Sequence, residues 1–306
     1  METFRRLEDL KLGGPSVVAV GVFDGVHVGH QAIMRIVKAD AAELGARSAV
    51  VTFDRDPEEL VSPRRPVAYL TTLRQKVDLI AEQGMDLAVV LPLGRWLIDM
   101  PAQQFVSSIL HERLGAVQIV VGANFAFGKG RAGSVGLLRE MGPDLGFEVV
   151  EVSPIKVDGL LVSSTSIRTL LADGNVEKAN VLLGHPFALE GRVVAGEGIG
   201  RSIGYPTANI EPVAEEVVPG RGVYAVSVNV GGATWTGVAN IGIRPTIGTR
   251  GTSIEAYIIG FSGDLYGQEL AMVFHHRLRD EVQFPDVEAL KLQVAHDIER
   301  ASRLVV

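Results

Sequence analysis

The chain of 306 residues contains no cysteine. Disulfide bonds, thiolate nucleophiles and cysteine-bound zinc are therefore excluded, although this absence leaves the redox compartment undecided. No run of roughly 18 apolar residues occurs, and the N-terminal stretch METFRRLEDL lacks the apolar segment of a secretion signal. We therefore expect neither a membrane span nor export, and we predict a cytoplasmic protein.

Basic residues are also fewer than acidic residues. The chain has 29 Lys and Arg against 36 Asp and Glu, a net charge of −7 at pH 7 and an isoelectric point near 5.6. Proteins that follow nucleic-acid phosphates usually present a basic face, so we expect small-molecule ligands and no nucleic-acid or membrane partner. The oligomeric state stays open. Hydrophobic residues make up 47%, and the length is typical of two domains with separate cores.

Two common nucleotide-binding motifs are missing. No G-x-x-x-x-G-K-[ST] sequence occurs, and the turn GVFDG does not have the spacing G-x-G-x-x-G. A P-loop and a Rossmann dinucleotide fingerprint are thereby excluded, so that ATP, if it binds, must be held in another way.

The stretch VVAVGVFDGVHVGH, residues 17–30, predicts a buried strand, a tight turn and the start of a helix that runs to about residue 44. His27 and His30 flank Gly29, and the second histidine falls in the first helical turn, where backbone N–H groups and the helix dipole attract anions. A single histidine there is most often a cap or a surface residue. Two of them, three residues apart after the first buried strand, resemble the HxGH signature of the nucleotidylyltransferase superfamily.

Short apolar runs alternate with helical patterns as far as about residue 152, which predicts a parallel sheet with right-handed crossovers. A ligand should bind beyond the carboxyl ends of the strands, where residues 21–30 and 121–131 fall. We predict strands near 17–21, 48–53, 87–91, 117–121 and 147–152, and helices near 30–44, 72–83, 101–111 and 133–141.

The glycine-rich loop over residues 120–134 carries an aromatic pair, Phe125 and Phe127, beside Asn124, Lys129 and Arg131. Such a set suits a flat ring that bears a phosphate. By itself the pattern is also typical of a flexible surface loop whose phenylalanines fold back onto the sheet. The neighbouring HVGH motif favours the interpretation as a substrate loop.

The sequence SSTSIR, residues 163–168, opens a helix that should end near Ala172. Serine and threonine at a helix start are most often only caps. Because Arg168 follows one turn later, N–H groups, hydroxyls and a guanidinium could converge on a triphosphate. A second short helix is expected to end near Leu183, and Gly184 marks the boundary that separates a domain 1–184 from a domain 185–306.

Beyond Pro186 the apolar residues alternate with a period of two, which predicts strands. At least five strands and a Gly231-Gly232 hairpin suggest a small closed antiparallel barrel. One amphipathic helix should begin near Pro285 and pack on the barrel through Val287, Leu290, Val294, Ile298 and Ala301. The strands are expected near 188–195, 223–230, 233–240, 254–261 and 269–276.

This second domain contains a glycine loop followed by the sequence PTAN, within residues 196–210. Thr207 and Asn209 offer a hydroxyl and an amide oxygen, which suit Mg²⁺ bound to phosphates. Glu255 stands in the apolar run IEAYII, where a carboxylate is unexpected unless it faces a cleft. The alternative is a structural strand glutamate that is either satisfied by hydrogen-bond partners or exposed at a sheet edge, and these interpretations stay open at this point.

The ordered motifs GVFDGVHVGH, VVGANFAFGKGRAG, SSTSIR, GRSIGYPTANI, GVANIGIRPTIG and EAYIIGFSGDLYG, followed by the final helix, resemble the bacterial bifunctional riboflavin kinase/FAD synthetase family over nearly the whole chain. The resemblance implies an α/β Rossmann-like FMN adenylyltransferase domain followed by a β-barrel riboflavin kinase domain, with ATP, riboflavin, FMN and FAD as substrates and products. The catalytic residues that it implies are His27, His30 and Glu255. Mg²⁺ would bind Thr207 and Asn209, and flavin would contact Asn124, Phe125, Phe127 and Arg131. ATP would contact Gly21, Phe23, Asp24, Gly29, Ser164, Thr165, Arg168, Gly198, Gly200 and Arg201.

Two positions depart from the family pattern, which often has a histidine where Asp56 stands and an aspartate where Gly260 stands. A different nucleotidylyltransferase with an accessory barrel is a rival enzyme interpretation. A flavin-binding sensor that has lost turnover is a non-enzymatic rival, and the intact HVGH and PTAN motifs argue against it.

Overall fold

The computed structural model describes residues 1–10, 13–61, 68–196, 198–213, 215–243 and 252–305. Its contacts divide the chain into two compact units. The first comprises Met1–Val67 and Leu73–Ser163, and the second comprises Ala68–Thr72 and Ser164–Val306. Within the described ranges, no helix combines the length and the apolar character needed to cross a membrane.

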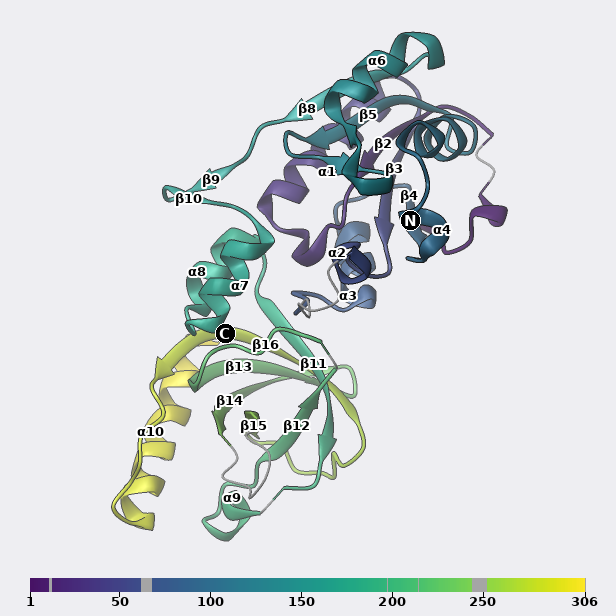
Figure 1. The fold of residues 1–306 in the computed structure, drawn as a ribbon. Coiled ribbons are helices and arrows are strands. Elements are labelled where there is room, and N and C mark those ends of the chain that lie inside the picture. The colour runs from purple at the N-terminus through teal and green to yellow at the C-terminus, as the bar shows by residue number, and fades with distance from the viewer. Residues whose placement is uncertain (11–12, 62–67, 197, 214, 244–251, 306) are drawn as a thin grey trace. The chain divides into compact units, whose positions relative to one another are not determined.

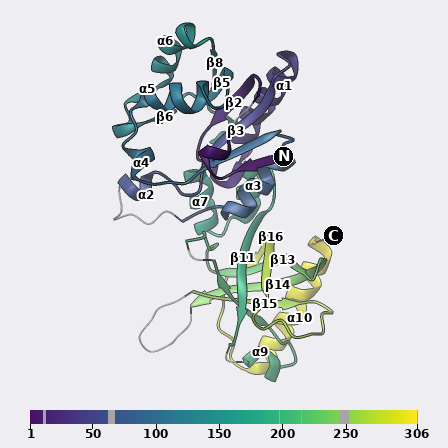
Figure 2. The same ribbon diagram turned by 90° about the vertical axis from the view of Figure 1, so that its right-hand side faces the viewer.

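The first unit is built on a six-stranded, wholly parallel sheet with the strand order β1-β4-β3-β2-β5-β8 (Figures 1 and 2). The five predicted strands are confirmed. The sixth, β1, was missed because its three residues pair only at the sheet edge and stay largely exposed. The bounds are β1 Glu2–Phe4, β2 Ser16–Val20, β3 Arg47–Phe53, β4 Leu87–Leu91, β5 Ala116–Gly122 and β8 Glu148–Val152.

Helices cover both faces of this sheet. Alternate residues of the central strand β2 therefore pack in two separate hydrophobic cores, one on each face. Val17 and Ala19 pack with α1 (Val28–Glu43) and α3 (Leu73–Glu82), while Val18 and Val20 pack with the helices of the other face. The other helices are η1 Leu7–Asp9, η2 Asp24–Val26, α2 Glu58–Val61, α4 Arg95–Ile98, α5 Ala102–Gln104 and its π-helical continuation η3 Phe105–His111, η4 Lys129–Arg131 and α6 Val135–Leu145. Two short hairpins pair β6 Ala126–Phe127 with β7 Gly133–Ser134, and β9 Lys156–Val157 with β10 Leu160–Leu161.

The strand order reverses at β2, which pairs with β3 on one side and with β5 on the other. The turn after β2 and the loop after β5 therefore leave the same edge of the sheet as neighbours. In open α/β sheets such a reversal is the place where ligands bind. The topology thus places the two predicted ligand loops at adjacent carboxyl ends.

The second unit contains a closed antiparallel barrel with the strand order β11-β12-β15-β14-β13-β16 (Figure 1). The predicted strands and the Gly231-Gly232 hairpin are confirmed. Strand β12 was missed, because its first residues belong to the PTAN motif, which we interpreted as a ligand loop. The bounds are β11 Phe187–Val194, β12 Ala208–Pro212, β13 Gly222–Val230, β14 Ala233–Ile243, β15 Thr252–Ile258 and β16 Glu269–Arg279.

The C-terminal helix α10 (Val287–Leu304) packs on β13, β14 and β16, as predicted (Figure 1). Ala301 is buried there. Val287, however, is 51% exposed, so its assignment to the packed face is wrong. The first turn is held instead by the Asp286 carboxylate, which accepts a 2.8 Å hydrogen bond from the Ala289 N–H.

The helices α7 (Ser164–Ala172) and α8 (Val176–Leu183) belong to the second unit. The Asn180 side chain joins α8 to the barrel, since it donates to the Phe274 carbonyl (2.9 Å) and accepts from the Phe187 N–H (2.8 Å). The second compact unit therefore starts before Gly184. That Gly184 separates the segments carrying the two activities stays a prediction.

A carboxyl group is buried where residues 68–72 join the second unit. Tyr69 pairs with the backbone on both sides of Glu216, through Tyr69 N–H to Glu215 O (2.7 Å) and Val217 N–H to Tyr69 O (2.8 Å). Burial, and next the charge of Glu190, raise the pKa of Glu216 to about 8, and its Oε2 atom has no hydrogen-bond partner in the described part of the chain.

We predict that Glu216→Gln stabilises the second unit at alkaline pH. Because the folded state raises this pKa above the unfolded value, the stabilising contribution is complete at acidic pH and is lost as the pH rises through about 8. Melting curves of wild type and variant should agree near pH 5 and differ by roughly a few degrees near pH 9. The exposed Glu211→Gln serves as the matched control, and a constant difference at all pH values would contradict the prediction.

Candidate functional site

The turn after β2 has a strained backbone. Phe23, Gly25 and Val26 have φ angles of 53°, 79° and 37°, and a positive φ costs a non-glycine residue on the order of 1–3 kcal/mol. The side chains of Phe23 and Val26 are buried in the core, and the Val22 carbonyl accepts a 2.9 Å hydrogen bond from Thr52 Oγ1. Packing and hydrogen bonding thus hold this turn in place.

His27 is the N-cap of α1. Its Nδ1 accepts from the His30 N–H at 3.3 Å, so its proton is carried by Nε2. The two imidazole rings stack with centroids 3.5 Å apart. A Cβ atom at Gly29 would lie 3.2 Å from the His27 ring, which is why glycine separates the two histidines. His27 is therefore both a helix cap and one of the two histidines of the HxGH pair.

His30 is neutral at pH 7. Burial lowers its pKa well below 6.5, and His27, when it is protonated, and Lys76 lower it further. The edge of the Phe23 ring packs against it at 5.1 Å, so Phe23, predicted to contact ATP, supports the histidine ring. Its buried Nδ1 atom has no partner among the described residues, and such an atom calls for a ligand in the occupied site.

Lys76 was missed by the sequence analysis. Its Nζ lies beneath the turn and donates to the Phe53 carbonyl (2.7 Å) and the Val22 carbonyl (3.2 Å), with only 4% of the residue exposed. Burial lowers its pKa to about 8. The available signal was its spacing of four from Ile80, which puts a lysine on the buried face of α3. Three carboxylates partly oppose the lowering: Asp24, Asp54 and Asp56.

The loop after β5 is an ordered hairpin. Phe127 is buried in the hydrophobic core on one face of the sheet, and its ring centroid lies 5.1 Å from that of Phe125, on which it stacks. One of the two phenylalanines therefore does fold back onto the sheet. The Lys129 N–H donates to the Met100 carbonyl at 2.8 Å and anchors the tip. Asn124 and Arg131 are exposed. The loop can therefore present Phe125, Asn124 and Arg131 to a ligand, with Phe127 as support.

Ser164, Thr165 and Arg168 lie in the first turns of α7, in the second unit. The Arg168 Nε donates to the Ala68 carbonyl at 2.7 Å, and therefore part of this guanidinium holds the segment 68–72. Their contribution to phosphate binding stays a prediction.

In the barrel, Thr207, Asn209 and Glu255 come together. The Thr207 hydroxyl donates to Glu255 Oε2 at 3.1 Å, and Asn209 lies directly opposite Glu255 in the pairing of β12 with β15. A Cβ atom at Gly196 would lie 2.1 Å from Asn209 Nδ2, so the glycine loop can close over this group only without a side chain there. Glu255 thus lines a cavity, and its strand is paired on both sides, which rules out the exposed-edge interpretation. Its bond to Thr207 fits a satisfied strand glutamate as well as a cleft-facing one, so a role in catalysis stays a prediction.

A cavity of about 510 Å³ opens beside this group. Glycine-loop residues Gly198 and Gly200 line it on one side, and Phe284, Leu290 and Val294 line it on the other. Among the polar residues that line it are Thr207, Asn209, Asn240 and Glu255, and the charged residues Arg279, Glu281 and Asp297 line it as well.

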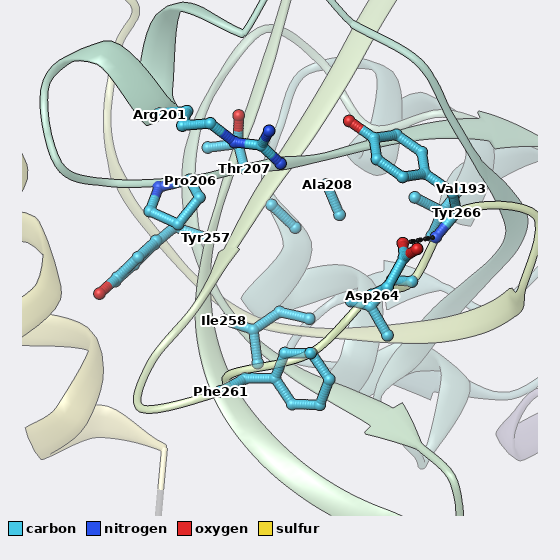
Figure 3. A pocket seen from close by; sticks show the side chains of 13 residues that line it. Val193, Arg201, Pro206, Thr207, Ala208, Tyr257, Ile258, Phe261, Asp264 and Tyr266 are labelled. Atoms are coloured by element: carbon cyan, nitrogen blue, oxygen red, sulfur yellow. Dashed lines mark hydrogen bonds between the residues drawn. The ribbon is translucent and has the colours of Figure 1, made fainter.

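Figure 3 shows a second cavity, of about 470 Å³, and Thr207 and Tyr257 line both cavities. Arg201 and Tyr266 lie toward one end of it, and Phe261 and Ile258 lie toward the other (Figure 3). The turn that bears Tyr266 is held by its N–H, which donates to Asp264 Oδ1 at 3.0 Å. These aromatic residues were not predicted as site residues, although they belong to the motif EAYIIGFSGDLYG.

The wall that α10 contributes to the larger cavity is fixed by a buried ion pair. Asp297, 1% exposed, receives Arg279 Nε at 2.9 Å and Nη2 at 2.8 Å. The Arg279 guanidinium also lies 5.6 Å from the centre of the Phe284 ring. This pair was missed because Asp297 falls on an otherwise apolar helix face.

The two positions that depart from the family pattern, Gly260 and Asp56, have local explanations. Gly260 has φ 74°, a conformation that aspartate tolerates better than most residues, so either residue type suits the position. Asp56 Oδ1 accepts from the Glu58 N–H at 2.9 Å and holds the start of α2.

Comparison with known proteins also divides the chain into two parts. The profile of the family described as FAD synthetase matches residues 11–166, and that of the riboflavin kinase family matches residues 183–305. The chain is 40% identical over 306 residues to a bifunctional riboflavin kinase/FMN adenylyltransferase of Pseudomonas fluorescens, covering 99% of this chain and 98% of that protein. It is 38% identical over 282 residues to the protein of the same name from Escherichia coli K12, covering 92% and 90%. A crystal structure described as a macrolide-efflux protein from Streptococcus pneumoniae is similar over 98% of both chains, with 29% identity and a TM-score of 0.89.

Proposed function

Since the chain belongs to the family of bifunctional riboflavin kinase/FMN adenylyltransferases, we propose that the His27–His30 turn and the Thr207–Glu255 cleft are the sites of its two activities. The enzyme phosphorylates riboflavin to FMN and adenylylates FMN to FAD, with ATP as the second substrate of both steps. The observation that carries the proposal is that each segment matched by one family profile contains one site of suitable chemistry.

Adenylylation needs no base. An oxygen of the FMN phosphate, ionised at neutral pH, attacks the α-phosphorus of ATP, and the bond to the bridging oxygen breaks as pyrophosphate leaves. The site must therefore align two anions and stabilise the charge of the transition state. The N-terminus of α1, the Nε2–H of His27 and the neutral His30 supply such donors.

Phosphorylation of riboflavin differs, because its nucleophile is a neutral hydroxyl. Glu255 accepts the hydroxyl proton as the oxygen attacks the γ-phosphorus, and ADP leaves. The Thr207 hydroxyl, 3.1 Å from Glu255 Oε2, holds the carboxylate in the cleft.

The donor set of the cleft fits Mg²⁺. A hydroxyl, an amide oxygen and a carboxylate meet at Thr207, Asn209 and Glu255, and hard oxygen ligands are those that this ion prefers. We assign Thr207 and Asn209 as the residues that would hold it. When bound, the ion would neutralise charge on the phosphates.

Two cavities that share Thr207 suit two substrates. The larger, lined by Phe284, Leu290 and Val294 and reached by Glu255, suits the flavin. The smaller, lined by Arg201 and Tyr266, suits the adenosine part of ATP, whose phosphates would extend past Thr207 to Gly198, Gly200 and Asn209 in the wall of the larger cavity. On this assignment the phosphoryl group passes beside Thr207.

The remaining assignments rest on the family resemblance. For nucleotide binding they are Gly21, Phe23, Asp24, Gly29, Ser164, Thr165, Arg168, Gly198, Gly200 and Arg201, and for flavin binding Asn124, Phe125, Phe127 and Arg131. A cytoplasmic location with only small-molecule partners is part of the proposal, because both steps consume ATP.

We predict that His30→Ala abolishes FAD formation and leaves FMN formation intact. Loss of one transition-state donor typically costs on the order of 10²–10³ in rate. The test is to incubate the protein with riboflavin and Mg-ATP and to separate riboflavin, FMN and FAD by chromatography. Riboflavin phosphorylation by the same sample is the internal control. FMN adenylylation within a few-fold of wild type would refute the role of His30.

Glu255→Gln should show the opposite pattern. The amide keeps the shape but cannot accept the proton, so we expect riboflavin phosphorylation to fall by roughly 10²–10⁴ while FMN adenylylation is spared. Glu269→Gln, an exposed carboxylate on β16, is the matched control. An unchanged kinase rate would leave Glu255 with a structural role only.

The fragments 185–306 and 164–306 should both convert riboflavin to FMN, because each contains the glycine loop, Thr207, Asn209, Glu255 and α10. Fragment 164–306 should melt at the higher temperature, since it keeps the bonds of Asn180 to Phe274 and Phe187. If either fragment unfolds cooperatively on heating, and so is folded, yet makes no FMN from riboflavin and Mg-ATP, the assignment of the kinase to the barrel fails.

A further inference from the structure

We propose that Lys76 is a positioning residue of the adenylylation site, whose buried ammonium group holds the turn 22–26 in its strained conformation and is itself stabilised when the ATP triphosphate binds above it. The inference rests on the assignment of FMN adenylylation to the His27–His30 site. Nothing in the motif pattern or in the family comparison assigns a role to this residue.

The first argument is geometric. Lys76 reaches from α3 and joins the ends of two neighbouring strands, since it donates to the carbonyl of Phe53, the last residue of β3, and to that of Val22, just after β2. Val22 precedes Phe23, the first residue of the turn with a positive φ. A strained backbone persists only where its surroundings over-determine it. Lys76 and Thr52 together fix the carbonyl from which the strained turn begins.

The second argument is electrostatic. A buried amide side chain could donate the same hydrogen bonds without the cost of burying a charge. Both partners of Lys76 are neutral carbonyls, and the pKa of Lys76 is lowered to about 8 even though Asp24, Asp54 and Asp56 oppose the lowering. The charge is therefore incompletely compensated in the free enzyme. Its field reaches His30, whose pKa it lowers, and so it extends to the start of α1.

A bound triphosphate would supply the missing negative charge. Anion binding near Lys76 then raises its pKa, and by thermodynamic reciprocity protonated Lys76 raises the affinity for ATP. As the pH rises through about 8, the free enzyme loses this proton and affinity falls. Of the other groups that face Lys76, His30 is already neutral at this pH because burial lowers its pKa, so its titration does not contribute.

The kinetic test compares Lys76→Met with wild type. We expect kcat/KM for FMN adenylylation to fall by roughly 10- to 100-fold, with most of the loss in KM for ATP. Riboflavin phosphorylation in the same sample should be unchanged. Lys38→Met, which removes an exposed lysine from α1, is the matched control and should behave as wild type.

The second test measures protons. Calorimetric titration with ATP near pH 8, in two buffers of different ionisation enthalpy, gives the number of protons taken up. The kinase site contributes equally to all variants, so the difference between wild type and Lys76→Met isolates the first site. Wild type should take up more protons than the variant, a difference that a purely structural lysine would not produce.

A third measurement applies even if Lys76→Met does not fold. In wild type, KM for ATP in FMN adenylylation should rise as the pH passes about 8. Lys76→Arg should abolish this rise, because a guanidinium stays charged throughout the range. A pH-independent KM in wild type, equal proton uptake, or wild-type kcat/KM in Lys76→Met would each overturn the proposal. If His30→Ala also leaves FAD formation unchanged, the site assignment fails; if only the Lys76 results are negative, the role of Lys76 alone fails.

Discussion

The left-handed backbone at Phe23 and Val26 is the constraint on which the first site depends. It bends the chain sharply enough after β2 for His27 to cap α1 and for His30 to stack on it within one turn. The surrounding core holds this conformation, because both strained residues are buried. Burial of the His30 ring keeps that side chain neutral, so that the site offers directed hydrogen bonds at the start of a helix.

The second site depends on close approach instead of strain. The glycine loop can lie against Asn209 because Gly196 has no side chain, and strand pairing sets Asn209 directly opposite Glu255. The pairing is part of a closed barrel, while the ion pair of Arg279 with Asp297 fixes the helix that walls the larger cavity. Precise placement on strands suits a step in which a carboxylate must be within hydrogen-bond reach of a hydroxyl.

On the proposed site assignment, one chain performs two transfers from ATP with different residues. A phosphate nucleophile requires only alignment and charge stabilisation, and the first site accordingly presents a helix start and imidazoles. A hydroxyl nucleophile also requires a proton acceptor, and the second site presents Glu255. In each proposed site, only a few residues would contact the phosphates. A chain of net charge −7 can therefore bind phosphates without a broadly basic surface.

The sequence by itself determined the two fold classes and the order of the motifs, and its local signals are those on which the two proposed sites were predicted: His27 and His30 around a glycine, the PTAN run, and a carboxylate in an apolar strand. Only the tertiary structure decided which distant residues complete them. Lys76 lies 54 positions from Val22 and 23 from Phe53, and it reaches both carbonyls because β2 and β3 are neighbours in the sheet. The placement of α7 and α8 with the barrel escaped prediction for the same reason, whereas β12 was missed because the PTAN motif was interpreted as a ligand loop. Periodicity reports which side of an element is buried, whereas the partner on that side is set by long-range pairing that one sequence does not encode locally.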